Sequence, residues 1–261
     1  MIDMSGIFSH VDYDETVVKF NDFKTPNCNS DCDWSLFQDL YKNVSNNKCP
    51  ICEVELVESP NHPYSATIDH FRPKASDMYP SLKCEPKNYI LMCRLCNNKY
   101  KEAKFPLLDE SKRATKAKTI TDARLEQPLL FNPAEEKPLD FFELAFRITE
   151  VGNILELKRK PIIPKGSYHY RRSAEMIKLF GLGNVHKDIH PDEDSKALRL
   201  DVLRLHYETF IELAQAIKGN DKKGCTLILM DENRKEMLKK YGFFDFLMKK
   251  QFSIQYQVDL I

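Results

Sequence analysis

The stretch that decides the fold lies between two short cysteine motifs, CPIC at 49–52 and CRLCN at 93–97. In each motif the two cysteines are three residues apart, a spacing that places both thiolates on one tight turn or helix start. Two such pairs supply the tetrahedral sulfur ligands that a structural zinc site requires. We therefore predict structural Zn²⁺ bound by Cys49, Cys52, Cys93 and Cys96.

Roles without zinc fit these cysteines less well. Reduced core thiols would not be expected to repeat the Cys-x-x-Cys spacing, and a thioredoxin-like redox motif would leave the second pair unexplained. Cys28 and Cys32 are spaced i, i+4 without a matching pair, so we do not expect a second metal site there. We expect Cys84 and Cys225 to be free thiols, because disulfides are rare in intracellular proteins.

The segment between the two pairs carries residue types that suit hydrolysis. It contains TIDHFRPK at 67–74, and NYILMCRLCNNK at 88–99 overlaps its end. A carboxylate and an amide oxygen are suitable ligands for a hard divalent cation such as Mg²⁺. A neighbouring imidazole then remains free to act as a base toward water. The combination suits metal-assisted cleavage of a phosphodiester.

This order of residues resembles the HNH endonuclease motif, in the subgroup whose ββα-metal core is held by a four-cysteine zinc. The resemblance covers about sixty residues. It implies Asp69 as ligand of a catalytic Mg²⁺ or Mn²⁺, and His70 as general base. Asn88 would brace the loop and orient the base, and Asn97 would be the second metal ligand. Asn98 competes for that last role, although Asn97 directly follows the cysteine.

The neutral net charge conceals a strong local pattern. The chain has 39 Lys plus Arg and 39 Asp plus Glu among its 261 residues. Residues 1–40 hold eight acidic residues against two lysines, whereas residues 70–104 hold eight basic residues against three acidic ones. Residues 158–172 add six basic residues and no acid. Because such clusters neutralise phosphates, we expect DNA or RNA to be bound by Arg72, Lys74, Arg94, Lys99 and Lys101.

Three regions are expected along the chain. Residues 1–47 would form an acidic N-terminal arm and helix, residues 48–110 the HNH nuclease core, and residues 111–261 a mixed connector followed by a helical region. The predicted fold class is α+β, with a zinc-stapled ββα-metal core and a mostly helical C-terminal region.

Local signals predict the elements outside the core. We expect residues 1–30 to be extended and a helix to begin after Asp33, an N-cap residue followed by apolar residues at helical spacing. Strands are expected at 141–149 and 153–157. Apolar stripes and stop signals predict further helices at 167–180, about 200–217 and about 231–241.

The last third carries a second resemblance. The segment YRRSAEMI at 170–177, running into LFGLGN at 179–184, looks like the helical tail of a bacterial group of HNH proteins. That group includes the HNH partner of an ATPase in Septu-type and retron-associated anti-phage defence systems. The resemblance implies a defence effector that docks an ATPase subunit through the acidic arm or the tail.

The alternative is a non-catalytic zinc-stabilised subunit that binds nucleic acid or docks the ATPase. Such a subunit would need the four cysteines but not Asp69, His70 and Asn97, all of which are present here. No apolar run approaches the roughly 18 residues of a membrane span, and the start does not resemble a cleaved signal. We therefore expect a cytoplasmic protein without a membrane partner.

Overall fold

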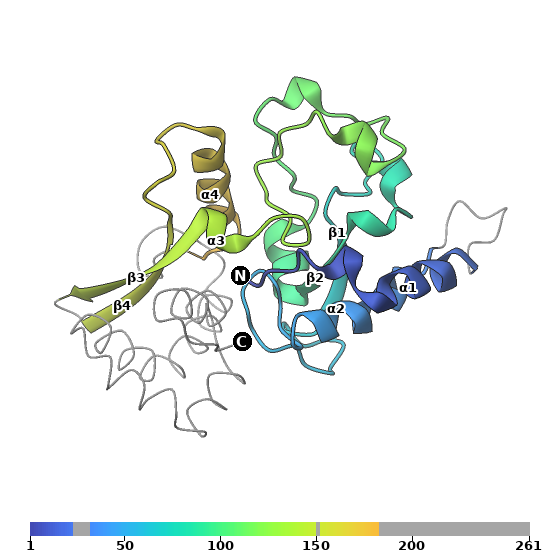
Figure 1. The fold of residues 1–261 in the computed structure, drawn as a ribbon, viewed down its shortest axis with the longest axis horizontal. Coiled ribbons are helices and arrows are strands. Elements are labelled where there is room, and N and C mark those ends of the chain that lie inside the picture. The colour runs from blue at the N-terminus through green and yellow to red at the C-terminus, as the bar shows by residue number, and fades with distance from the viewer. Residues whose placement is uncertain (23–31, 150–151, 183–261) are drawn as a thin grey trace.

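The structure is a computed structural model that describes residues 1–22, 32–149 and 152–182 (Figure 1). The helices predicted near 200–217 and 231–241 lie outside the described residues, as do Cys28 and Cys225. Within the described ranges, the helices are too short or too polar to cross a lipid bilayer.

A helix, α1 (Val11–Asp22), occupies much of the segment that was predicted to be an extended arm, so that prediction is wrong. Tyr13 and Phe20 are buried and stand seven residues apart, which places them on one helix face. Asp12 and Asp14 lie in the first turn, where the helix dipole favours negative charge. The acidity that suggested a solvated arm is thus compatible with a helix that packs on the core.

The helix predicted after Asp33 is confirmed. It consists of a short 3₁₀ turn, η2 (Trp34–Phe37), continued by α2 (Gln38–Val44), and the Asp33 side chain caps its start. The chain leaves it through Asn46 and Asn47, whose φ values of 52° and 56° lie in the left-handed region that asparagine tolerates.

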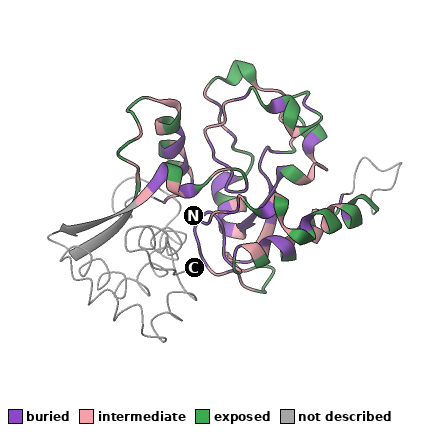
Figure 2. Ribbon diagram, in the orientation of Figure 1, coloured by how far each residue is buried: buried purple, intermediate pink, exposed green. Residues whose placement is uncertain are grey.

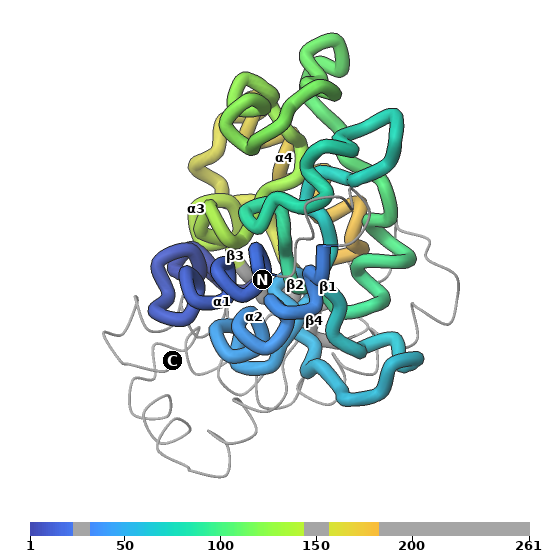
Figure 3. Tube along the Cα trace, turned by 90° about the vertical axis from the view of Figure 1, so that its right-hand side faces the viewer, coloured from blue at the N-terminus to red at the C-terminus, as the bar shows by residue number. Residues whose placement is uncertain are grey.

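A two-stranded antiparallel sheet lies beside α2. Strand β1 (Ala66–His70) pairs with β2 (Tyr89–Cys93), with Ala66 opposite Cys93 at one end and His70 opposite Tyr89 at the other. One turn of π-helix, η5 (Cys96–Lys101), follows β2. In Figures 1 and 3 α2 runs alongside this hairpin, and α2 contacts both strands. Helices and small antiparallel sheets together confirm the predicted α+β class.

The core around the hairpin is aromatic. Phe20, Phe37 and Tyr89 pack on one another with ring centroids 5.3 to 5.9 Å apart. The Tyr41 hydroxyl donates a hydrogen bond to the carbonyl of Tyr89 at 2.9 Å. Buried residues gather where α1, α2 and the hairpin meet (Figure 2). Because Tyr89 lies opposite His70, this cluster supports the end of the hairpin that carries the candidate base.

A second hairpin follows the connector. Strands β3 (Phe142–Thr149) and β4 (Gly152–Arg159) pair antiparallel, which confirms the two strands predicted there. In the sequence they follow α3 (Pro138–Phe141) and precede α4 (Tyr168–Leu179). The Ser167 side chain caps α4, as predicted. The remaining short helices are η1 (Ile7–Ser9), η3 (Pro80–Leu82), η4 (Pro86–Asn88), η6 (Glu110–Lys112) and η7 (Ile120–Ala123).

A buried polar network ties the connector to the segment that follows β1. Glu126 Oε2 accepts a hydrogen bond from Arg72 Nε at 3.0 Å. Glu126 Oε1 accepts from the Tyr79 hydroxyl at 2.6 Å and from the Ala114 amide at 2.7 Å. The side chains of Arg72 and Glu126 are both almost fully buried. The carboxylate therefore satisfies donors from three separate segments of the chain.

We expect Glu126→Ala to lower the free energy of unfolding by about 3–5 kcal/mol, because it leaves the Arg72 guanidinium buried without its counterion. Urea unfolding followed by circular dichroism measures the loss. Glu58 is the matched control, since it pairs with Lys42 at an exposed position, and Glu58→Ala should cost no more than about 1 kcal/mol. Equal losses for the two variants would contradict the assigned role of Glu126.

Candidate functional site

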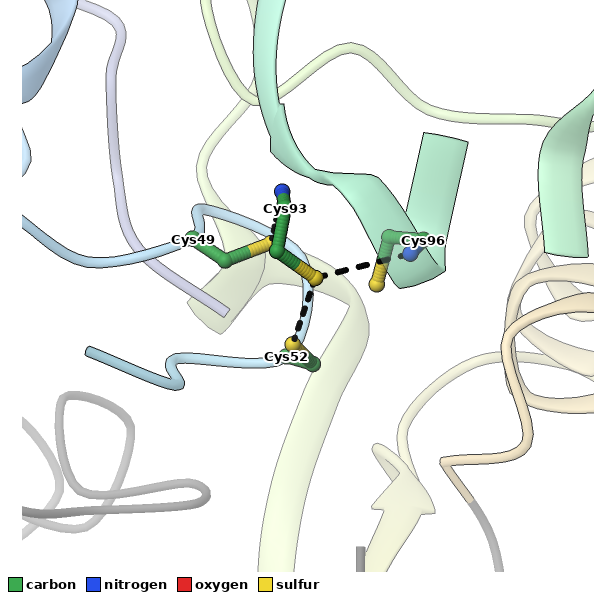
Figure 4. Close-up of side chains that lie close together, drawn as sticks. All are labelled: Cys49, Cys52, Cys93 and Cys96. Atoms are coloured by element: carbon green, nitrogen blue, oxygen red, sulfur yellow. Dashed lines mark hydrogen bonds between the residues drawn. The ribbon is translucent and has the colours of Figure 1, made fainter. Parts of the chain in front are cut away.

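The first cysteine pair lies on a tight turn. The Cys49 amide donates to the carbonyl of Val54 at 2.9 Å, and the Glu53 amide donates to the carbonyl of Cys49 at 2.8 Å. Glu53 reverses the chain with a φ of 62°. This compact turn directs the sulfur atoms of Cys49 and Cys52 to the same side (Figure 4).

The second pair brackets the junction of strand and helix. Cys93 ends β2 and Cys96 begins η5. All four sulfur atoms lie within 4.8 Å of one another, and all four residues are buried. The Cys93 amide donates to the sulfur of Cys49 at 3.3 Å, and the sulfurs of Cys52 and Cys93 are 3.7 Å apart (Figure 4). Residues forty positions apart in sequence thus form one four-sulfur cluster.

The electrostatics of the cluster suit a bound cation. Burial alone would raise the pKa of Cys49, but hydrogen bonds with Cys52, Cys93 and Cys96 lower it well below its ordinary value. Burial, together with the neighbouring sulfurs, raises the pKa of Cys93 and of Cys96. Several thiolates can accumulate in such a space when a divalent cation compensates their charge. The donor set therefore fits the predicted structural zinc.

Side-chain alternation along β1 separates two of the candidate catalytic residues. Thr67 and Asp69 face η5, because Asn97 Nδ2 donates to Thr67 Oγ1 at 3.0 Å and Lys101 Nζ lies 2.7 Å from Asp69 Oδ2. His70 faces the opposite side of the strand, toward η2. The helix thus presents Asn97 and Lys101 to the same face of the strand.

Lys101 was predicted to bind nucleic acid, and the structure contradicts this. The residue is completely buried, and its Nζ donates to the carbonyl of His70 at 2.9 Å while it pairs with Asp69. Burial raises the pKa of Asp69, and the Lys101 ammonium opposes this shift. The Asp69 carboxylate is therefore held against a buried ammonium, which favours its ionised form.

The His70 side chain is fixed by one hydrogen bond. Its Nε2 lies 2.9 Å from the carbonyl oxygen of Lys83, which also accepts from the Tyr89 hydroxyl at 2.9 Å. A carbonyl only accepts, so Nε2 must carry the hydrogen, and the neutral ring then has its lone pair on Nδ1. Burial lowers the pKa of His70 to about 4. The imidazole is therefore neutral at pH 7, as a general base must be.

Asn88 connects two parts of the loop that joins β1 to β2. Its Oδ1 accepts from the Arg72 amide at 2.8 Å, and its Nδ2 donates to the carbonyls of Arg72 at 2.9 Å and Leu82 at 3.2 Å. The Phe71 amide donates to the Asn88 carbonyl at 2.7 Å. These contacts hold the chain that directly follows His70 against the turn that precedes Lys83.

The two adjacent asparagines differ in environment. Asn97 is half-buried and contacts β1, whereas Asn98 is exposed. Of the two, Asn97 lies on the side of η5 that faces Asp69. The structure therefore favours Asn97 over Asn98 for the predicted ligand role.

The other basic residues predicted to contact nucleic acid fall into two groups. Arg72 is buried and paired with Glu126, which contradicts the predicted contact with a phosphate. Lys74 and Lys99 are exposed, and Arg94 is half-buried with its Nη1 donating to the carbonyl of Pro60 at 2.7 Å. Counting charges along the chain could not distinguish a buried, paired basic residue from an exposed one, because the partner of Arg72 lies more than fifty residues away in the sequence.

Cys84 is not a free thiol, contrary to prediction. It forms a disulfide with Cys32 across 52 residues of sequence. The spacing of Cys32 from Cys28 offered no hint of this distant partner. The cross-link joins the segment before η2 to the turn that holds Lys83.

Trp34 is a site residue that sequence reasoning missed. It is the only tryptophan in the chain, and its ring lies edge-on to His70, with centroids 5.1 Å apart. The one signal that could have singled it out was the presence of the single tryptophan in an acidic segment. Proximity to His70 depends on packing between β1 and η2, which local sequence does not encode.

Together the fold and the site define an α+β protein with a buried four-cysteine cluster that can hold a metal ion. The chain is similar to the Septu protein PtuB of Bacillus mycoides (strain KBAB4), with 32% identity over 134 residues. The similarity covers 47% of this chain and 42% of the relative, so the chain matches less than half of the relative's length. No protein-family model and no solved structure matches the chain.

We expect the purified protein to contain about one zinc ion per chain, and Cys93→Ser to lose it, because three sulfurs and a hydroxyl do not hold structural zinc as tightly. Elemental analysis after dialysis measures the content. The double variant Cys32→Ser/Cys84→Ser is the matched control and should retain its zinc, since the disulfide is separate from the cluster. Zinc lost from the control, or retained in Cys93→Ser, would contradict the assignment.

Lys101→Met should lower the free energy of unfolding by about 3–5 kcal/mol, because it leaves Asp69 buried without its counterion. Asp69→Asn in the same chain should recover part of the loss by removing the unpaired charge. Lys104 is the matched control, since its ion pair with Glu102 is half exposed, and Lys104→Met should cost no more than about 1 kcal/mol. Urea unfolding measures the unchanged protein, the Lys101 and Asp69 single variants, their double variant and the control. Additive effects of the Lys101 and Asp69 changes would argue against an interaction between the two side chains.

Proposed function

We propose that the chain is a metal-dependent HNH-type endonuclease that hydrolyses phosphodiester bonds of DNA or RNA. The observation that carries the proposal is the unit formed by β1, β2 and η5. It holds Asp69, His70 and Asn97 within one hairpin and one helical turn, and its strand-to-helix junction belongs to the four-cysteine cluster. In this proposal residues 48–110 form the nuclease core, and residues 1–47 and 111–261 flank it.

His70 is proposed as the general base. With Nε2 donating to the Lys83 carbonyl, Nδ1 is the atom that would take a proton from the attacking water. The hydrogen bond fixes both the tautomer and the ring orientation, so the lone pair does not have to be positioned during the reaction. Asn88 would support this arrangement by joining the chain after His70 to the turn that precedes Lys83.

Asp69 and Asn97 are the proposed ligands of a divalent cation, which when bound would stabilise negative charge on the leaving oxygen. Asn97 Nδ2 already donates to Thr67 Oγ1, so Oδ1 is the ligand atom of its amide. Lys101 would keep Asp69 ionised, because its ammonium opposes the effect of burial on the carboxyl. An ionised carboxylate is the form that binds Mg²⁺ or Mn²⁺.

We further propose that the nuclease is the effector of an anti-phage defence system. Similarity to a Septu protein supports this assignment. The resemblance of the helical tail to HNH partners of an ATPase supports an ATPase subunit as its partner. Asp12, Asp14 and Glu15 are exposed on α1 and offer an acidic surface for that partner.

The test is cleavage of DNA and RNA by the purified protein with Mg²⁺ or Mn²⁺, alone and with the ATPase subunit. We expect His70→Ala to slow cleavage by about 100- to 10,000-fold, the usual contribution of a general base. Zinc content and thermal stability, measured on the same samples, show whether the variant is folded.

His62 provides a matched control. It is a half-buried histidine in the loop before β1, where its Nδ1 accepts from the Tyr64 amide, and His62→Ala should cleave at close to the normal rate. Equal activity of His70→Ala and the unchanged protein would overturn the mechanism. Nucleic-acid binding without cleavage under all of these conditions would instead support the non-catalytic alternative.

A further inference from the structure

The side of β1 that carries His70 is covered by Trp34. This residue begins η2 and is half-buried, and its ring plane makes an angle of 76° with the imidazole at a centroid distance of 5.1 Å. An edge-on aromatic contact of this kind restricts the imidazole without hydrogen bonding to it. Trp34 therefore lies at the boundary between the buried base and solvent.

Two lysines are grouped on the Trp34 ring. Lys74 Nζ lies 3.8 Å from the ring centroid, and Lys83 Nζ lies 6.0 Å from it. An ammonium over an indole face is attracted by the ring quadrupole, so the ring holds a flexible lysine in one place. The two lysines come from the first and second halves of the loop that joins β1 to β2. Trp34 thus gathers both ammonium groups beside His70.

The charge of Lys74 is not balanced by an ion pair. Lys74 is exposed, and no carboxylate among the described residues forms an ion pair with it. The nearby Asp69 is already paired with the buried Lys101. The surface next to the proposed base therefore carries positive charge.

The covalent structure keeps this group together. Cys32 lies two residues before Trp34, Cys84 directly follows Lys83, and a disulfide joins them. The Lys83 carbonyl also accepts the hydrogen bond from His70. The aromatic ring, the lysine and the base are therefore attached to one cross-linked segment, which limits their relative movement.

We propose that Trp34, Lys74 and Lys83 form a phosphate-binding subsite for the nucleic-acid strand next to His70, with Trp34 as a positioning residue that holds Lys74. The inference rests on the proposed function, because the ligand is the backbone of the nuclease substrate. It adds two residues, Trp34 and Lys83, that the predicted binding set lacked. Two ammonium groups on one rigid ring suit adjacent oxygens of a phosphodiester.

The test measures binding of a fluorescently labelled oligonucleotide to the full chain at 50 to 200 mM NaCl, without added Mg²⁺ or Mn²⁺, which the proposed cleavage requires. Lys74→Gln and Lys83→Gln should each reduce the slope of log affinity against log salt by about 0.7 to 0.9, the effect of one phosphate contact. Lys112 is an exposed lysine beside Asp109, and Lys112→Gln should keep the full slope. Unchanged slopes for both site variants would overturn the proposal.

A double-mutant cycle tests the positioning role. Trp34→Leu removes no charge, yet it should weaken binding about two- to fivefold by releasing Lys74. In the Lys74→Gln chain the same change should have no further effect, whereas Trp34→Phe should retain most of the affinity. A full effect of Trp34→Leu in the Lys74→Gln chain would show that the ring does not act through Lys74. Zinc content and circular dichroism confirm that each variant is folded.

Failure of this inference can be distinguished from failure of the proposed function. Binding is measured without catalysis. If the protein is inactive but the lysine variants show reduced salt slopes, the phosphate-binding subsite is supported and the nuclease activity is contradicted. If cleavage depends on His70 but the lysine variants bind like the unchanged protein, the nuclease activity is supported and the phosphate-binding subsite is contradicted. Quenching of the single tryptophan by the oligonucleotide gives an independent signal from Trp34 itself.

Discussion

The four-cysteine cluster sets the geometry on which the candidate active site depends. It joins the turn at Cys49 to the point where β2 ends and η5 begins, so the helix must return along β1. Four residues of a helix and two of a strand both advance by roughly 5 to 7 Å. Asn97 therefore meets Thr67, and Lys101 meets Asp69. The same constraint that orders the cluster brings these side chains together.

The two faces of β1 give neighbouring residues different electrostatic environments. On the helix side, burial favours the protonated form of Asp69 and the Lys101 ammonium opposes it. On the other side, burial favours the neutral form of His70, and the surrounding lysines act in the same direction. Desolvation thus acts on both groups, but only the carboxylate has an internal counterion. A charged carboxylate and an uncharged imidazole can therefore coexist at adjacent positions.

Local patterns predicted much of the fold because they depend on short segments of chain. The Cys-x-x-Cys pairs, the cap at Asp33 and the cap at Ser167 each depend on a few neighbouring residues, and the structure contains all of them. The Cys32–Cys84 disulfide and the ion pair of Arg72 with Glu126 join residues about fifty positions apart. Spacing and composition carry no information about such partners, because the partners are selected by packing of the whole core.

Distant partners also determine which basic residues of the segment 70–104 are buried and which face solvent. A linear count treats Arg72 and Lys101 as equivalent to Lys74, yet both are buried next to carboxylates. At distances beyond the Debye length, about 8 Å at physiological salt, such a pair contributes little to the field that an approaching phosphate experiences. Of the eight basic residues counted at 70–104, two exposed or half-buried lysines, Lys74 and Lys83, lie against the Trp34 ring beside His70. A phosphate attracted by these two ammonium groups would therefore be brought next to the candidate base.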